Sequence, residues 1–98
     1  MYRWLHDSHK PVYTISVAAE LIGCHPRTLR IYEEEELVQP KRTQKKYRLY
    51  SQHDLTKIKR LNSLMAEWGL TLAGVRAMLK MAERFHIEVE SMLDEMLK

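Results

Sequence analysis

The side chains best suited to molecular recognition lie between positions 27 and 32 of this 98-residue chain. They fall in the first turns of a helical segment that begins at a proline, and they are Arg27, Thr28, Arg30 and Tyr32. Arginine can donate two hydrogen bonds to one guanine, and all three residue types bind backbone phosphates. Each could instead be a solvated surface residue, and Tyr32 could pack against a later helix. Their joint placement favours contacts to base edges and phosphates.

A second group of cations lies in residues 41–48, which contain no acidic residue. Residues 38–50 are typical of two short strands around a turn, because Tyr47–Tyr50 alternates in the manner of a strand. A basic hairpin can lie along a phosphate backbone, although a solvated loop is the alternative. The cations of this hairpin are Lys41, Arg42, Lys45, Lys46 and Arg48.

The elements that would position the first group have the outline of a helix-turn-helix. We predict a first helix with Ser16 as its N-cap, ending at Ile22. A break follows at Gly23, and His25 then caps a second helix with Pro26 at its first position, where a missing N–H costs nothing. This second helix is expected to end near residues 34–36.

Two further helices follow the hairpin. Ser51 with Asp54 three residues later is a variant of the capping box and opens a third helix that Gly69 ends. Thr71 caps a fourth helix, and the apolar spacing continues to Leu97. We therefore predict a mainly α fold: an N-terminal arm at 1–12, a helix-turn-helix domain with a small β-hairpin wing at 13–82, and a C-terminal dimerisation helix at 83–98.

The last segment carries an apolar stripe at helical spacing. A short chain buries little core, so an apolar terminal helix is costly to leave in water. Folding back onto the same chain is the alternative, but we expect the stripe to join two copies of the chain. Its members are Phe85, Val89, Met92, Leu93 and Met96.

Composition and charge exclude several classes of protein. The net charge is +3, no apolar run has the length of a membrane span, and no signal-peptide pattern opens the chain, so we expect a protein of the bacterial cytoplasm. A lone cysteine, Cys24, and five histidines without ligand spacing predict no metal site and no cofactor. No catalytic set of residues is recognisable, so we expect no enzyme.

Several ordered segments of the chain carry a shared pattern, and they are Tyr13–Leu21, His25–Glu33, Leu37–Pro40, Arg42–Thr43 and Tyr47–Ser51. Together these segments resemble the MerR family of winged-helix regulators. Within that family, Leu70–Val75 and the pair His25-Pro26 resemble the heat-shock repressor branch, HspR. The similarity covers about residues 13–80.

The resemblance implies a homodimer that binds double-stranded DNA in the nucleoid. It places the second helix in a major groove, with DNA contacts at the positions of Arg27, Arg30 and Tyr32. It also implies backbone contacts from the wing at the positions of Arg42, Tyr47 and Arg48. The branch implies repression of chaperone and protease genes at inverted-repeat operators, with a DnaK-type chaperone as co-repressor in some members.

The chain departs from the family pattern at two turns. A family glycine after the second helix is Glu36 here, the last of four glutamates at 33–36, and the wing tip carries Lys45-Lys46 in place of a glycine. A non-glycine residue in the left-handed region costs about 1 kcal/mol. The negative run near DNA favours an alternative function, a MerR-like adaptor that binds a chaperone or co-chaperone without binding DNA.

Overall fold

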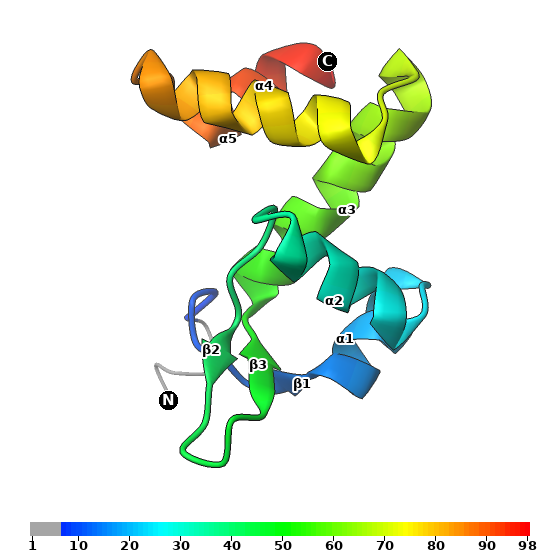
Figure 1. Ribbon diagram of the computed structural model, residues 1–98, viewed down its shortest axis with the longest axis vertical. Coiled ribbons are helices and arrows are strands. Elements are labelled where there is room, and N and C mark those ends of the chain that lie inside the picture. Colours follow the sequence, from blue (N-terminus) through cyan, green and yellow to red (C-terminus); the bar gives the residue numbers. More distant parts are fainter. Residues whose placement is uncertain (1–6) are drawn as a thin grey trace. The chain divides into compact units, whose positions relative to one another are not determined.

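The structure is a computed structural model that describes residues 7–98, and the chain divides into two compact units, Met1–Ile58 and Lys59–Lys98 (Figure 1). The part of the predicted arm at positions 1–6 lies outside the described residues. The prediction of a mainly helical fold with a small hairpin is confirmed. In chain order the elements are β1 (Tyr13–Thr14), α1 (Ile15–Ile22), α2 (Pro26–Glu34), β2 (Lys41–Arg42), β3 (Arg48–Tyr50), α3 (Gln52–Trp68), α4 (Leu72–Arg84) and α5 (Val89–Met96).

The first helix begins earlier than its sequence predicts. Thr14 is the N-cap, because its backbone is extended and its hydroxyl accepts a hydrogen bond from the Val17 N–H at 3.3 Å. Ser16, the predicted cap, lies inside α1, so that prediction is wrong by two positions. The helix ends at Gly23, whose φ of 88° lies in the left-handed region, and the Gly23 N–H donates to the Ala19 carbonyl.

The second helix begins and ends where the sequence predicts. The Nδ1 atom of His25 accepts a hydrogen bond from the Arg27 N–H at 3.0 Å, and Pro26 occupies the first turn. The helix ends at Glu34. Glu36 then has a φ of 64°, which confirms that a non-glycine residue fills the left-handed turn position. The Leu37 N–H closes this turn by donating to the Tyr32 carbonyl at 2.8 Å.

The sheet has three antiparallel strands in the order β1-β3-β2. The hairpin of β2 and β3 was predicted, and the structure adds its register, in which Arg42 lies opposite Arg48. Strand β1 was not predicted, because a strand of two residues shows no alternation and its partner strand is distant in sequence. In the structure Tyr13 pairs with Tyr50. The described part of the arm is bonded to this unit, since the Val12 N–H donates to the Tyr50 carbonyl.

A single apolar core supports the helix-turn-helix and the sheet. Tyr50 is fully buried in it, and its hydroxyl has no hydrogen-bond partner among residues 7–98. Burial, followed by the nearby Glu33 carboxylate, raises the pKa of Tyr50 to about 12, because both disfavour the phenolate. The other buried apolar side chains of this unit are Ala18, Ala19, Leu29, Tyr32, Leu37, Val38, Leu55 and Ile58.

The capping predictions for the later helices are confirmed. The Ser51 hydroxyl accepts from the Asp54 N–H at 3.0 Å, and the Ser51 N–H donates to the Asp54 carboxylate at 2.9 Å, which completes the capping box. Gly69, with a φ of 63°, follows the last residue of α3. The Thr71 hydroxyl accepts from the Gly74 N–H at the start of α4.

The predicted single helix at 83–98 is wrong. α4 runs to Arg84, and the Ile87 N–H donates to the Ala82 carbonyl as the chain turns through His86, whose φ is 57°. A new helix, α5, starts at Val89 with the Glu88 carboxylate as its cap. The apolar spacing fits one helix, but the left-handed residue at 86 interrupts the helical hydrogen bonds.

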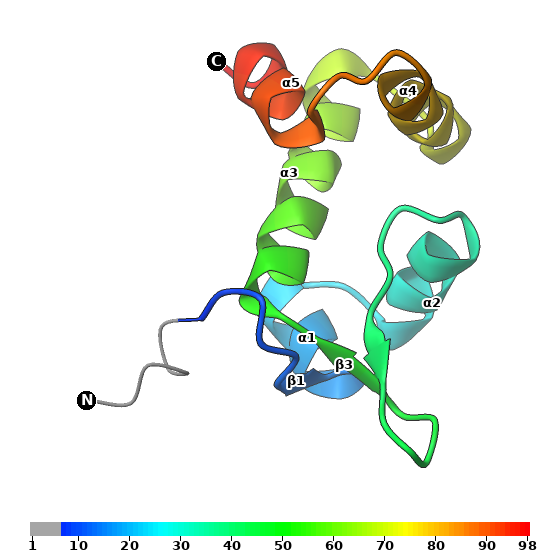
Figure 2. The same ribbon diagram turned by 90° about the vertical axis from the view of Figure 1, so that its left-hand side faces the viewer.

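Helix α5 lies against α3 within the second unit (Figure 2). An ion pair joins Arg60 to Asp94, and the Trp68 indole N–H donates to the Met96 carbonyl at 3.1 Å. Leu93 is 1% exposed, so it belongs to the core of its own chain. Part of the stripe therefore folds back onto the same chain, which was the alternative that the sequence left open.

Candidate nucleic-acid interface

The outward face of α2 carries the two arginines that the sequence singles out. Arg27 and Arg30 are exposed, and Thr28 is half-buried beside them. Leu29 holds this face in place because it is fully buried on the opposite side of the helix. Two guanidinium groups thus project from the first half of α2, where they can reach base edges or phosphates.

Tyr32 is mainly a core residue. Only 8% of it is exposed, and burial, followed by the neighbouring Cys24, raises the pKa of its phenol. Its predicted contact with DNA stays a prediction. Cys24 is half-buried in the turn before α2, and burial also raises the pKa of its thiol, which keeps the sulfur protonated and suits a packed turn residue.

The hairpin loop, residues 43–47, extends beyond the strands (Figure 2). The Lys46 N–H donates to the Thr43 carbonyl and the Thr43 N–H to the Tyr47 carbonyl, each at 2.9 Å. Lys46 has a φ of 69°, so it takes the left-handed position that a glycine usually fills. Lys45, Lys46 and Tyr47 are all exposed at this tip, as phosphate contact requires.

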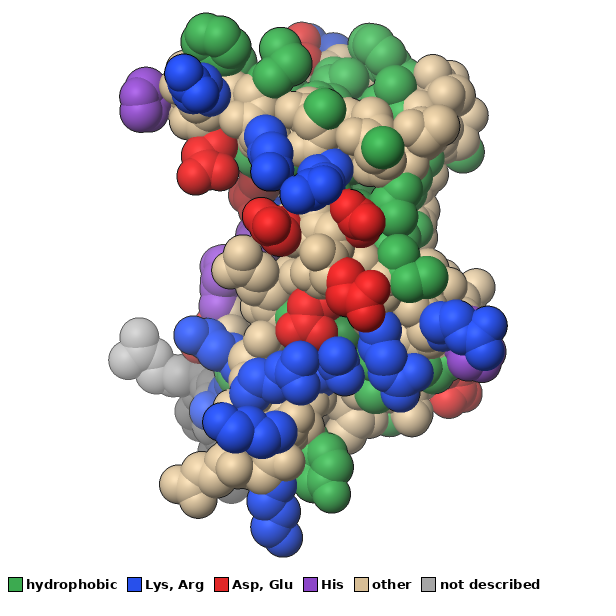
Figure 3. All heavy atoms as spheres, in the orientation of Figure 1, with side chains coloured by type: hydrophobic (Ala, Val, Ile, Leu, Met, Phe, Trp, Pro, Cys, Tyr) green, Lys and Arg blue, Asp and Glu red, His purple; other side chains and the backbone are tan. Residues whose placement is uncertain are grey.

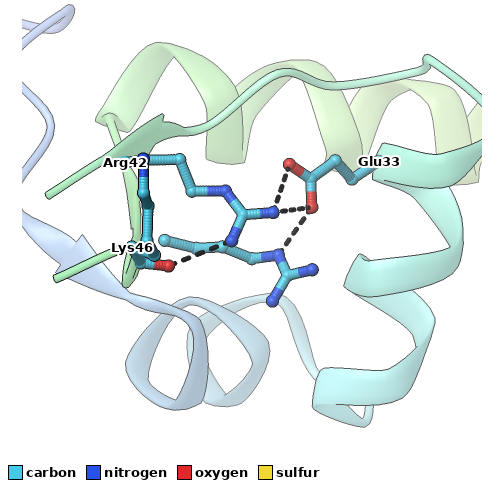
Figure 4. Close-up of polar contacts among 4 residues, drawn as sticks. Glu33, Arg42 and Lys46 are labelled. Atoms are coloured by element: carbon cyan, nitrogen blue, oxygen red, sulfur yellow. Dashed lines mark hydrogen bonds and ion pairs between the residues drawn. The ribbon is translucent and has the colours of Figure 1, made fainter.

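One carboxylate connects α2 to the hairpin (Figure 4). Glu33 accepts from the Arg48 Nε at 2.6 Å through Oε1, and its two oxygens each lie 3.2 Å from the Arg42 Nη2. The Arg42 Nη1 also donates to the Lys46 carbonyl at 3.0 Å. The two wing arginines predicted to bind DNA are therefore held together by an acid of the second helix.

Sequence reasoning missed this role of Glu33 and treated it as one of four repelling charges. No spacing rule could have found it, because Glu33 lies 9 residues from Arg42 and 15 from Arg48. Glu35 and Glu36 also have interaction partners. Within residues 7–98 only Glu34 of the run has none, and the charge of Glu33 is compensated by Arg42 and Arg48.

Basic side chains gather over α2 and the hairpin on one face of the first unit (Figure 3). This arrangement brings together the two groups that lie apart in sequence. We call this surface the basic face and define it by its exposed cations, which are Arg27, Arg30, Lys41, Arg42, Lys45 and Lys46.

The second unit exposes large apolar side chains around the end of α4. Phe85 is 65% exposed, Met81 59% and Ile87 49%, and Trp68 at the end of α3 is also exposed. Of the predicted dimerisation residues, Val89, Met92 and Met96 are half-buried and Leu93 is buried. None of the described helices is long and apolar enough to cross a membrane.

Comparison with known proteins identifies the family. The model of the MerR HTH family of regulatory proteins matches residues 13–82. The chain belongs to the MerR family. The sequence-based assignment is thus confirmed, and because MerR proteins are regulators, the chain is not an enzyme.

The relatives agree on this assignment. A Streptomyces coelicolor protein assigned as heat shock protein HspR is 42% identical over 71 residues, which is 72% of this chain and 47% of the relative. The regulator GlnR of Bacillus cereus is 36% identical over 73 residues, which is 74% of this chain and 56% of GlnR. The chain spans about half the length of these curated relatives.

Two solved structures share the fold. A MerR-family transcriptional regulator from Bacillus cereus has a TM-score of 0.61 and 27% identity, covering 86% of this chain and 60% of its own. HiNmlR, a MerR-family regulator lacking the sensor domain and bound to promoter DNA, has a TM-score of 0.56 and 21% identity, covering 87% of this chain and 69% of its own. The MerR-like fold predicted from the sequence is confirmed.

Proposed function

We propose that this MerR-family chain is a sequence-specific DNA-binding transcriptional regulator. The observation that carries the proposal is the basic face, where exposed arginines of a helix-turn-helix lie beside a basic hairpin. A helix of this kind fits a major groove, and the adjacent hairpin then meets the flanking phosphates. Arg27 and Arg30 read base edges or hold phosphates, and Lys45, Lys46, Tyr47 and Arg48 bind the backbone.

The proposed targets are heat-shock genes, and the proposed action is repression. The support is the identity of 42% with the HspR-assigned protein, which is higher than the 36% with GlnR. Occupation of a promoter would block transcription in the bacterial cytoplasm. A DnaK-type chaperone as co-repressor remains part of this proposal, because it follows from the same branch.

The proposed active form is a homodimer that binds an inverted repeat. Two half-sites need two copies of α2, and linking two copies strengthens binding without any new contact to DNA. The apolar side chains Met81, Phe85 and Ile87 supply surface for such a contact, because large exposed apolar groups mark interaction sites. Val89, Met92 and Met96 border it in sequence.

The adaptor that binds only protein is the weaker alternative. Its main support was the glutamate run, and within that run the Glu33 carboxylate is paired with Arg42 and Arg48. That alternative assigns no binding role to the exposed arginines of α2.

Selection of DNA from a random pool tests the proposed function. The wild-type chain is mixed with duplexes randomised over about 30 base pairs, or three helical turns. We expect enrichment of an inverted repeat, and of sites upstream of chaperone genes when fragments of the source genome replace the random pool. Failure to enrich any sequence, together with capture of a J-domain protein, would favour the adaptor.

A further inference from the structure

The hydrogen bonds of Glu33 leave a defined part of each wing arginine available. Arg48 uses its Nε for Glu33, and in the described part of the chain nothing bonds its two Nη atoms. Arg42 uses Nη2 for Glu33 and Nη1 for the Lys46 carbonyl. Both Nη atoms of Arg42 thus already have a partner within the protein, whereas both Nη groups of Arg48 keep all of their N–H donors for a ligand.

We propose that Glu33 is a positioning residue that holds the wing against α2 and presents the Nη groups of Arg48 to a DNA phosphate. This inference rests on the proposed function, because it assigns a role within DNA binding. Glu33 need not touch DNA. It fixes the orientation of a guanidinium whose planar fork binds phosphate in a directional manner.

The burial of the paired side chains favours a positioning role for Glu33 over simple charge pairing. The side chains of Glu33 and Arg48 are only 21% and 23% exposed, whereas that of Arg42 is 42% exposed. A partly buried, charge-assisted hydrogen bond is directional and less screened by salt than an exposed pair. The Glu33–Arg48 bond therefore restricts where the hairpin can lie relative to α2.

The direction in which one substitution changes DNA affinity distinguishes a positioning role of Glu33 from a purely electrostatic one. Glu33→Gln removes a negative charge near DNA, so electrostatics alone predicts tighter binding to every duplex. Positioning predicts weaker binding to the selected duplex, because the amide oxygen left in Glu33→Gln accepts only a weaker, neutral hydrogen bond from Arg48 and orients it less firmly. Because non-specific binding tolerates many wing orientations, the affinity of Glu33→Gln for non-specific DNA is expected to equal that of wild type or to exceed it.

Glu34→Gln is the matched control. Glu34 is the next residue, is exposed, and has no partner among residues 7–98, so its loss changes the charge alone. Both variants and wild type are titrated against the duplex selected by wild type and against a shuffled duplex of equal composition. We expect Glu33→Gln to weaken selected binding about five- to tenfold, as loss of a charge-assisted hydrogen bond does. Glu34→Gln is expected to strengthen binding to both duplexes to a similar, small extent.

A second variant keeps the proposal testable if Glu33→Gln folds poorly. Arg48→Lys retains the charge but cannot bond Glu33 and a phosphate through separate nitrogens. It is expected to weaken selected binding by a similar factor, and the double variant is expected to be no worse than either single one. Thermal melts followed by circular dichroism establish that each variant is folded.

An experiment on the unbound protein separates failure of this inference from failure of the proposed function. The Arg48 Nε–H proton is followed by nuclear magnetic resonance, together with the Thr43 and Tyr47 amides of the loop. In wild type we expect slow solvent exchange at Nε. In Glu33→Gln, where the acceptor is a neutral amide oxygen, we expect faster exchange at Nε and faster motion of the loop amides. Positioning is refuted if this signal exchanges equally fast in both proteins, or if Glu33→Gln binds the selected duplex as tightly as Glu34→Gln. If wild type binds no duplex, the proposed function fails and the contact of Arg48 with a phosphate fails with it, whereas the exchange at Nε still tests whether Glu33 holds the hairpin.

Discussion

The Nε of Arg48 donates to Oε1 of Glu33 at 2.6 Å, and this bond joins β3 of the hairpin to α2 of the helix-turn-helix. The two elements that would contact DNA are thus fixed to each other before any DNA arrives. Such preorganisation lowers the entropy that binding must overcome. The glutamate run, which appears from the sequence to repel DNA, includes the residue that organises the basic face.

Arg30 is the residue we expect to read a base. Arg30→Ala should weaken binding to the selected duplex by about 1–3 kcal/mol and relax preference at one base step per half-site. Fluorescence anisotropy with a panel of single-base variants measures this. Lys98→Gln, which removes a cation whose side chain is 73% exposed at the other end of the chain, is the control and should leave the preference intact. Unchanged discrimination in a folded Arg30→Ala protein would refute base readout.

Glu36 is held in a backbone conformation that favours glycine. Its φ is 64°, so Glu36→Gly should remove a strain of about 1 kcal/mol. The interaction that Glu36 makes, and the greater freedom of glycine in the unfolded chain, offset part of this gain. We expect a rise of a few degrees in the melting temperature of the first unit.

Glu34→Gly is the control for that prediction. Glu34 is the last residue of α2 and has no left-handed backbone, so glycine there should lower the melting temperature. Equal destabilisation by both substitutions would mean that the turn at Glu36 carries no strain.

Tyr50 should make the first unit sensitive to alkali. Its pKa is raised from 10.0 to about 12 in the folded protein. Below pH 10 neither state ionises, but between pH 10 and about 12 the unfolded chain loses this proton while the folded protein keeps it. The free energy of unfolding therefore falls across this window as pH rises.

Tyr50→Phe should remove most of that loss, as measured by denaturant melts at pH 9 through 12. A smaller loss remains from Tyr32, whose pKa burial also raises. At neutral pH the variant should be as stable as wild type or more stable, because a buried hydroxyl without a partner is removed. Tyr47→Phe, at a position 68% exposed, serves as the control that keeps the alkaline loss.

Substitutions of two apolar residues in the second unit are expected to have different effects. Phe85 is 65% exposed, so Phe85→Asp should leave the helices folded and raise the dimer dissociation constant at least about tenfold. Leu93 is 1% exposed, so Leu93→Asp should unfold this unit instead. Light scattering and circular dichroism distinguish the two. A Phe85→Asp protein as dimeric as wild type would place the interface elsewhere.

The sequence predicts well those features that depend on neighbouring residues. The caps His25 and Thr71 and the capping box at Ser51 were correct, because each cap bonds an N–H two or three residues away. The left-handed turn at Glu36 was anticipated from the family resemblance, because members carry a glycine at this position.

Long-range partners and unusual turns could not be predicted in this way. Strand β1 exists because Tyr13 finds Tyr50, and Glu33 has its role because the fold brings Arg48 to it. The break at His86 was missed because a histidine occupies a left-handed position where glycine is the usual signal. The stripe toward the end of the chain kept its apolar period across that break.

The most direct test of the central claim is the salt dependence of DNA binding. Wild-type chain is titrated against the selected inverted repeat, its single half-site and a shuffled duplex, at two salt concentrations. We predict the tightest binding to the inverted repeat, and a logarithmic salt slope of magnitude about 3 to 4 or more, because at least two wing cations in each of two subunits neutralise phosphates. Binding that is absent at micromolar protein, or that is equal for all three duplexes, would contradict the account.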